Sequence, residues 1–291
     1  AAGVPCLGIE PTASTAAAAE ALGIPVMRAF FGEALGRRLS SAGRLADLIV
    51  GNNVFAHVPD INDFCRGLKA ALKPGGTITL EFPHLMRLLE NTQFDTVYHE
   101  HFSYLSLGAA VEIFREAGLL VRRVEELSTH GGSLRIHGCH ADASVTIDTS
   151  VPELLAEEER RGLRSLATYG SFQDAANRVK NDLVAFLIEQ KRAGRSVAAY
   201  GAAAKGNTLL NYAGIRPDLL PFVCDAAPAK QGKFLPGSHV PILPPTALRA
   251  RRPDFLLILP WNIAGEVIAG CADLAAAGTR FVTAVPRLEI S

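Results

Sequence analysis

The sequence has few features of a metal-binding or disulfide-bonded protein. Its 291 residues include five cysteines, which are widely separated and never form a CxxC pair. Zinc sites and disulfide frameworks need closer or paired spacing, so we expect reduced, mostly buried thiols in a cytoplasmic protein. These cysteines are Cys6, Cys65, Cys139, Cys224 and Cys271.

Charge of one sign and long apolar runs are also missing. Lysine plus arginine and aspartate plus glutamate both total 29, so the formal net charge is zero. No long block of like charge marks a nucleic-acid or membrane-surface protein. No apolar run reaches the ~18 residues that a membrane span requires. We therefore expect neither nucleic acid nor membrane as a partner, while a hydrophobic share of 48% is enough for a sizeable core.

Short apolar runs alternate with helical patterns in the first half of the chain. Such alternation predicts a parallel sheet that is covered by helices on both faces. Two later runs are joined by a loop that contains glycine, which predicts a hairpin. The alternating runs are 4–12, 25–31, 46–53 and 77–83, and the hairpin runs are 119–127 and 132–140.

The second half begins with a different pattern. Apolar residues recur at steps of three and four between charged residues over 151–193, which predicts long amphipathic helices. The α/β alternation restarts at 196 and includes a helical stretch over 262–277. We therefore predict an α/β protein with a Rossmann-like domain over 1–150, a helical connector over 151–194 and a smaller Rossmann-like domain over 195–291.

Polar residues follow two of the predicted strands in the first half. Glu10 ends the first run, and Asn52 and Asn53 end the third. In doubly wound sheets ligands bind beyond the carboxyl ends of the strands, where an acid can accept hydrogen bonds from a ribose diol. The alternative is local: Glu10 would cap the helix over 14–22, and the asparagines would turn the chain. The pattern alone leaves both interpretations open.

A nicotinamide site would need GxGxxG between a strand and a helix, and the first half has no such motif. The strand order instead resembles the sheet of S-adenosylmethionine (SAM) methyltransferases, and "LKPGGTITLEFP" resembles the segment after their adenine-binding loop. Their first strand and glycine-rich loop are missing. We therefore expect an N-terminally truncated chain with a gap, or a foreign element, beside the strand that ends at Glu10.

The segment "FDTVYHEHFSYLS", residues 94–106, concentrates titratable side chains. It closely resembles the signature of SAM-dependent C-methyltransferases that act on nucleotide-linked ketosugars in deoxysugar pathways. The segments "NNVFAHVPD", "THGGSLRI" and "YGAAAKGNT" extend this resemblance over essentially the whole chain. The family carries zinc in an N-terminal cysteine-rich module, which this chain lacks. We expect no metal in the residues present, because a site at His99 and His101 would lack a third ligand.

Methylation of a carbon next to a ketone needs a base for the C–H and hydrogen-bond donors for the enolate oxygen. The resemblance places Tyr98, Glu100 and His101 at active-site positions, with His57 across from them. It implies that His101 is the base and that Glu100 orients an imidazole or holds a sugar hydroxyl. It also implies that Tyr98 and His57 donate to the enolate. In an extended segment His99 points away from its neighbours, so we expect a structural role for it.

The remaining segments of the resemblance imply a pocket for the nucleotide-linked sugar. Two glycines let the backbone of the "THGG" loop approach a ligand, although a tight turn with positive φ would need them as well. After "SVAAYGA", a helix start can offer N–H groups to a phosphate, and a tight packing corner is the alternative. Implied cofactor contacts are Glu10, Pro11, Phe31, Asn52 and Asn53. Implied sugar-nucleotide contacts are His130, Gly131, Gly201, Lys205, Asp225, Lys230 and Lys233, with solvated loop charges as the alternative for the last two.

The sequence thus predicts a SAM-dependent C-methyltransferase that acts on a nucleotide-linked 4-ketosugar. Two alternatives stay open, and so does the oligomeric state. A nicotinamide-dependent sugar oxidoreductase would use the second domain for its cofactor, but "GAAAKG" replaces the glycine fingerprint there. A non-catalytic remnant would bind the sugar nucleotide without SAM.

Overall fold

The computed structural model describes residues 3–291, which form two compact units. Unit 1 comprises the chain up to Phe82 together with 105–127 and 134–157. Unit 2 comprises 83–104, 128–133 and 158–291. The chain therefore passes between the units several times, and the segment with the concentrated titratable side chains belongs largely to unit 2. The boundaries at 150 and 195 stay a prediction.

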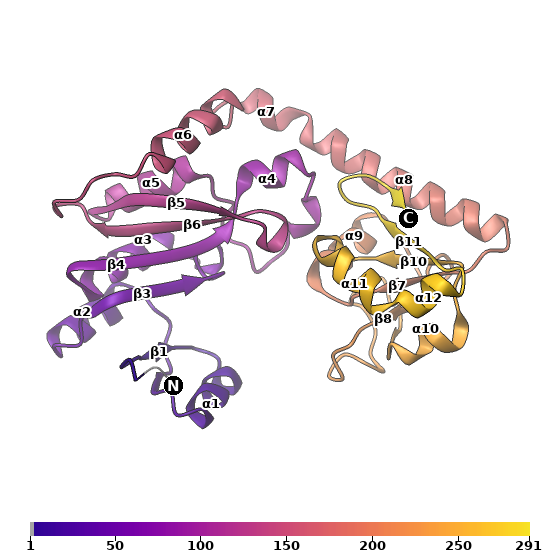
Figure 1. Cartoon of the computed structure of the whole chain (residues 1–291), viewed down its shortest axis with the longest axis horizontal. Helices are drawn as coiled ribbons and strands as arrows, with labels where there is room; N and C mark the ends of the chain where they lie inside the picture. Colours follow the sequence, from indigo (N-terminus) through magenta and orange to yellow (C-terminus); the bar gives the residue numbers. More distant parts are fainter. Residues whose placement is uncertain (1–2) are drawn as a thin grey trace. The chain divides into compact units, whose positions relative to one another are not determined.

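Unit 1 contains the sheets that the first half of the sequence predicts (Figure 1). Parallel pairing joins β1 to β2 and, separately, β3 to β4, as the alternation of runs predicts. The four-stranded sheet has the order β3-β4-β6-β5, so the two runs of the predicted hairpin are neighbours. The strands are β1 (Gly8–Ile9), β2 (Val26–Met27), β3 (Ala46–Asn52), β4 (Leu72–Pro83), β5 (Leu119–Leu127) and β6 (Ser133–His140).

The strands of unit 1 form two separate sheets, in agreement with the gap that we expect beside the strand that ends at Glu10. Within residues 3–291, β1 and β2 form a two-stranded sheet of their own, and β3 is the outer strand of the larger sheet. Two apolar side chains of β3 are accordingly exposed, Leu48 by 56% and Val50 by 60%. Strand β4 begins earlier than the predicted run 77–83 and includes "KPGG", because Leu72 already pairs with Ala46 of β3.

Three helices of unit 1 and the strand β4 contribute to a cluster of phenylalanine rings. Phe55 is fully buried and lies 5.4 Å from the ring of Phe82, 6.1 Å from that of Phe64 and 6.2 Å from that of Phe114. The elements are α1 (Ala13–Ala21), α2 (Glu33–Ser41), the 3₁₀ helix η1 (Phe55–His57), α3 (Ile61–Ala71) and α5 (Leu107–Glu116). Burial of these rings fixes η1, and with it His57, against the sheet.

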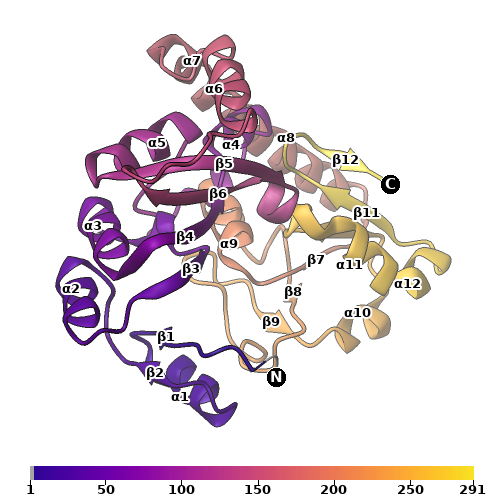
Figure 2. The same ribbon diagram turned by 60° about the vertical axis from the view of Figure 1, so that its left-hand side comes forward.

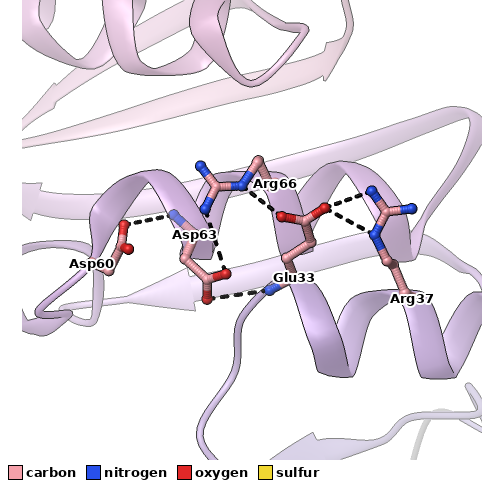
Figure 3. Close-up of polar contacts among 5 residues, drawn as sticks. All are labelled: Glu33, Arg37, Asp60, Asp63 and Arg66. Atoms are coloured by element: carbon pink, nitrogen blue, oxygen red, sulfur yellow. Dashed lines mark hydrogen bonds and ion pairs between the residues drawn. The ribbon is translucent and has the colours of Figure 1, made fainter.

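Helices α2 and α3 touch through their backbones. A Cβ on Gly36 would collide with the carbonyl of Gly67, so neither helix can carry a side chain at this crossing. An ion-pair network spans the same contact (Figure 3): Glu33 accepts bonds from Arg37 of its own helix and from Arg66 of α3. Asp63 of α3 also accepts from the backbone N of Glu33 at 3.3 Å. This crossing holds the start of α2 directly after Phe31.

Unit 2 contains a six-stranded sheet of the order β12-β11-β10-β7-β8-β9. Its strands are parallel except for β12 at one end, and Figure 2 shows β7, β8 and β9 side by side. The strands are β7 (Val197–Tyr200), β8 (Val223–Cys224), β9 (Ile242–Leu243), β10 (Phe255–Ile258), β11 (Arg280–Thr283) and β12 (Glu289–Ile290). This is the Rossmann-like domain that the restarted α/β pattern predicts.

The helices of unit 2 include three short ones that carry site residues. These are η2 (Phe94–Thr96), η3 (Thr129–Gly131) and η4 (Trp261–Ile263). The others are α4 (Leu85–Glu90), α7 (Leu166–Gly170), α8 (Phe172–Arg192), α9 (Ala204–Tyr212), α10 (Thr246–Arg251), α11 (Ala264–Gly270) and α12 (Ala272–Ala276), and α6 (Ser150–Arg160) begins in unit 1. Helix α9 packs against η2.

Two predicted helices are broken in the structure. The helical stretch over 151–193 begins with two separate helices, α6 and α7, because Gly162 takes a φ of +73° that ends the first of them. The stretch over 262–277 divides into η4, α11 and α12 with a break at Cys271, whose φ of −117° is not helical. Apolar periodicity continues across both breaks, which is why the pattern does not reveal them.

Four of the five cysteines are buried, as predicted, and only Cys6 is exposed. Burial raises the pKa of the Cys65 thiol to about 12 and that of Cys224 to about 11. Over residues 3–291, no helix is both long and apolar enough to cross a membrane.

Candidate functional site

His101 is held by the backbone of its own segment. Its Nδ1 lies 2.8 Å from the carbonyl oxygen of Thr96, the last residue of η2. Tyr104 donates its hydroxyl to the same carbonyl at 3.5 Å, and its ring meets the imidazole edge-on at 5.9 Å. Thr96 is itself fixed, because its N–H and its hydroxyl both bond to the carbonyl of Gln93, at 3.0 and 2.7 Å.

The ring of Tyr98 also lies against the imidazole of His101. The two ring centroids are 4.5 Å apart with an interplanar angle of 31°. Burial raises the pKa of the Tyr98 hydroxyl, and the nearby charge of Glu100 raises it further, so this tyrosine stays protonated at neutral pH. Glu100 and His99 are exposed, as is typical of a turn between the two aromatic positions.

The loop Thr129–Gly132 takes the conformation that its glycines allow. His130, Gly131 and Gly132 have φ angles of +57°, +89° and +119°. The two glycines therefore stand where a tight turn needs positive φ angles. Gln93 donates its side-chain amide to the carbonyl of Gly131 at 2.7 Å. The side chain of His130 is exposed. This loop and the segment before His101 are therefore joined within unit 2.

Lys205 and Trp261 approach the same loop from the C-terminal half of the chain. The Lys205 ammonium donates to the carbonyl of His130 and to the side chain of Asn262, both at 3.2 Å, and lies 4.6 Å from the centre of the Trp261 ring. Trp261 donates its indole N–H to Asp95 Oδ2 at 2.7 Å. The pKa of the Asp95 carboxyl group is raised, because burial outweighs two opposing effects. These are the hydrogen bond from Trp261 and the positive charge of Lys205, which both lower the pKa.

Gly201 and Asp225 lie at the carboxyl ends of β7 and β8. Gly201 has a φ of +96°, and a Cβ there would collide with Pro260, so the packing corner foreseen as an alternative is present. Asp225 is buried, and hydrogen bonds from Ala227, Lys230 and Ala202 outweigh burial and lower the pKa of its carboxyl group.

The two lysines of the following loop differ. Lys230 lies 3.1 Å from Asp225 Oδ2, whereas Lys233 is exposed. Lys230 thus helps to hold Asp225 in its place. The backbone of Lys233 is also fixed, because its carbonyl accepts the N–H of Ile242 at 2.8 Å.

The residues expected at a cofactor lie in unit 1. Glu10 follows β1, and its Oε1 accepts a bond at 2.7 Å from the N–H of Thr12, the residue directly before α1. Asn53 has a φ of +54° and donates its backbone N–H to Glu81 at 2.8 Å, so it does turn the chain. The other residues of this set are Pro11, Phe31, Asn52 and His57; Pro11 and Asn52 are exposed, and Phe31 and His57 are half-buried.

Sequence reasoning missed four residues of the site in unit 2. Asp95, Thr96 and Tyr104 stand in the quoted segment but had no role, and Trp261 was not considered. The signal for Trp261 was its rarity, because it is the single tryptophan of the chain, two residues after a strand-like run. Across the described residues, 3–291, no group of three or more His, Cys, Asp or Glu side chains is placed to hold a metal ion.

Two methyltransferase families match the two halves of the chain. Residues 3–124 match the methyltransferase domain family, and residues 128–286 match the family described as the C-methyltransferase C-terminal domain. The C-methyltransferase NovU of Streptomyces niveus is 37% identical over 289 residues, which cover 99% of this chain and 69% of NovU.

Solved methyltransferase structures show more distant likeness. A SAM-dependent methyltransferase of Thermotoga maritima, described as a possible histamine N-methyltransferase, has a TM-score of 0.37 at 19% identity over 47% of this chain and 72% of its own. Magnesium protoporphyrin IX methyltransferase of Synechocystis, with bound S-adenosylhomocysteine, has a TM-score of 0.34 at 15% identity over 47% of this chain and 64% of its own. The matches to NovU and to the two domain families show that the chain belongs to the C-methyltransferase family and is a SAM-dependent methyltransferase.

Proposed function

We propose that the protein methylates a carbon atom next to the ketone of a nucleotide-linked 4-ketosugar, through an enolate that forms when His101 removes a proton. One observation carries this proposal: His101 Nδ1 lies 2.8 Å from the carbonyl oxygen of Thr96. A carbonyl oxygen only accepts hydrogen bonds, so Nδ1 carries the hydrogen. When the imidazole is neutral, a hydrogen on Nδ1 leaves the lone pair on Nε2, as a general base requires.

The neighbours of His101 suit the other half of the reaction. Removal of the proton places negative charge on the ketone oxygen, which a hydrogen-bond donor stabilises. Tyr98 is such a donor at neutral pH, because burial raises the pKa of its hydroxyl. We assign the same role to His57, and we assign Glu100 to a sugar hydroxyl or to the orientation of an imidazole.

The residues at the strand ends of unit 1 suit SAM by their chemistry. We assign the ribose diol to Glu10, whose carboxylate can accept two hydroxyls, and the adenine edge to Asn52 and Asn53, whose amides both donate and accept. Phe31 supplies an apolar ring beside them, packed edge-on against Phe64 at 5.5 Å, and Pro11 completes this set. Bound SAM supplies an electrophilic methyl group on a sulfonium that departs as a neutral thioether.

The sugar nucleotide is assigned to unit 2. We place its diphosphate at the basic residues Lys230, Lys233 and Lys205 and at the turn of Gly201, and a hydroxyl at Asp225. The loop of His130 and Gly131 would border the sugar ring. Support for this set comes from positions at strand ends and from the loop's connection to the segment of His101.

Incubation of the protein with SAM and a nucleotide-linked 4-ketosugar tests the proposal. We expect S-adenosylhomocysteine to form in step with a sugar product that is heavier by one methylene group, with the new carbon–carbon bond visible by NMR. The same nucleotide sugar with its ketone reduced to an alcohol is the control, because no acidic C–H remains next to a carbonyl. Methylation of both sugars, or at oxygen, would contradict the proposed chemistry.

Replacement of Glu10 by alanine tests the cofactor assignment. We expect the change to weaken SAM or S-adenosylhomocysteine binding by about 1.5–3 kcal/mol, the scale of hydrogen bonds to a charged group. Isothermal titration calorimetry measures this loss, and Glu20→Ala is a matched control because Glu20 pairs with Arg28 at the surface of unit 1. Equal affinity of Glu10→Ala and wild type would remove Glu10 from the cofactor site.

A further inference from the structure

Asp95 is a buried carboxylate with an incomplete set of partners. Its side chain is fully buried, Oδ2 accepts the indole N–H of Trp261 at 2.7 Å, and Oδ1 has no hydrogen-bond partner among residues 3–291. Buried polar atoms are nearly always satisfied, so an exception calls for an explanation. A contribution to the stability of the fold does not explain this carboxyl group, because burial raises its pKa and so makes its charged form unfavourable.

The position of Asp95 along the chain supplies an explanation. It is the middle residue of η2, and the next residue, Thr96, carries the carbonyl that bonds to His101. The two peptide units are covalently joined inside one turn, so a shift of Asp95 moves that carbonyl. The carbonyl in turn fixes which nitrogen of His101 carries the hydrogen and how the ring is oriented.

Trp261 is itself held firmly enough to act as an anchor. It begins η4 shortly after the buried strand β10, and its backbone N–H bonds to Leu259 at 2.9 Å. The Lys205 ammonium lies over its ring, and a Cβ on Gly131 would collide with the indole. Lys205 also donates to the carbonyl of His130 and to the side chain of Asn262, so the indole packs against a lysine that is itself held in place.

We propose that Trp261 and Asp95 are a positioning pair that holds the Thr96 carbonyl, and through it His101, in the geometry of a base. This inference rests on the proposed function of His101. The hydrogen bond joins residues 166 positions apart, so the Rossmann-like domain of unit 2 takes a direct part in setting the base. Neither residue touches the reacting atoms.

Trp261→Phe removes the indole N–H while keeping an aromatic ring under Lys205. We expect a fall in kcat of about 10- to 100-fold, the scale that a small displacement of a catalytic group produces. The KM for SAM should not change. NMR of isotope-labelled histidine should show His101 in one tautomer, protonated at Nδ1, in the wild type and in a mixture of tautomers in the variant.

Asp95 variants separate the hydrogen bond from packing. Asp95→Asn keeps an oxygen that accepts from Trp261, so kcat and the His101 tautomer should stay close to wild type. Asp95→Leu has a similar size without an acceptor and should behave as Trp261→Phe does, and it replaces that variant if the latter does not fold. Tyr212→Phe is the control, because it removes a hydroxyl that bonds to Asn177 while its ring stays 5.2 Å from Phe94 of η2.

The outcomes distinguish this inference from the proposed function. If His101→Ala keeps wild-type activity, the proposed base is wrong. If His101→Ala is inactive but Trp261→Phe and Asp95→Leu keep the wild-type kcat and tautomer, the positioning pair alone is refuted. A fall in kcat for Tyr212→Phe equal to that for Trp261→Phe would also refute it, because general packing of η2 would then explain the effect.

Discussion

His101→Ala should lose deuterium exchange and methylation together, each by about 10²–10⁴-fold, the contribution of a general base. In the proposed reaction proton removal precedes methyl transfer, so the two steps can be followed separately. With ketosugar and no SAM, the wild type should exchange the acidic C–H for solvent deuterium, which NMR of the sugar reports directly. The affinity for S-adenosylhomocysteine should stay at the wild-type level, because we assign His101 to the sugar and not to the cofactor.

Two neighbouring variants calibrate this result. Tyr98→Phe should be milder, because it removes one proposed donor to the enolate and leaves the proposed base in place. His99→Ala should be the mildest of the three, since the side chain of His99 is exposed and faces solvent. If His101→Ala exchanges at the wild-type rate while Tyr98→Phe or His57→Ala does not, the base lies elsewhere.

Phe55→Ala should lower the free energy of unfolding of unit 1 by about 3–5 kcal/mol, as expected for an aromatic ring removed from a core. Phe55 is fully buried and contacts the rings of Phe64, Phe82 and Phe114, so its loss leaves a cavity that three fixed rings cannot close. Urea unfolding followed by circular dichroism measures the change.

Phe30→Ala is the matched control for Phe55→Ala. Phe30 lies in the same unit and is 84% exposed, so its replacement should change the stability by no more than about 0.5 kcal/mol. Equal losses for the two variants would show that the phenylalanine cluster does not determine the stability of unit 1.

The sequence predicts the strands of this protein better than its helix ends. Buried parallel strands are short apolar runs between breakers, and runs such as 46–53 and 77–83 stand out without any knowledge of the fold. Helix ends depend on single backbone conformations. The positive φ of Gly162 and the non-helical φ of Cys271 interrupt patterns that stay apolar on the same face.

The candidate site was predictable where its chemistry is local. A block with His101 and Tyr98 is visible as a concentration of titratable groups, and the family resemblance gives these groups roles that the residues alone do not. The contact between Asp95 and Trp261 is not visible, because it joins residues 166 positions apart and depends on how the domain folds. A similar reason hides the crossing of α2 and α3 at Gly36, which requires knowledge of both helices.

Over residues 3–291, one cysteine is exposed to thiol-reactive dyes in the folded chain. Cys6 is exposed, whereas the other four thiols are buried and burial raises the pKa of each, so their reactive thiolate forms are scarce. A maleimide fluorophore should therefore attach at one position, shortly before β1 and Glu10, without prior mutagenesis. A conjugate made in this way would give the strand that carries the proposed ribose contact an optical reporter of its own.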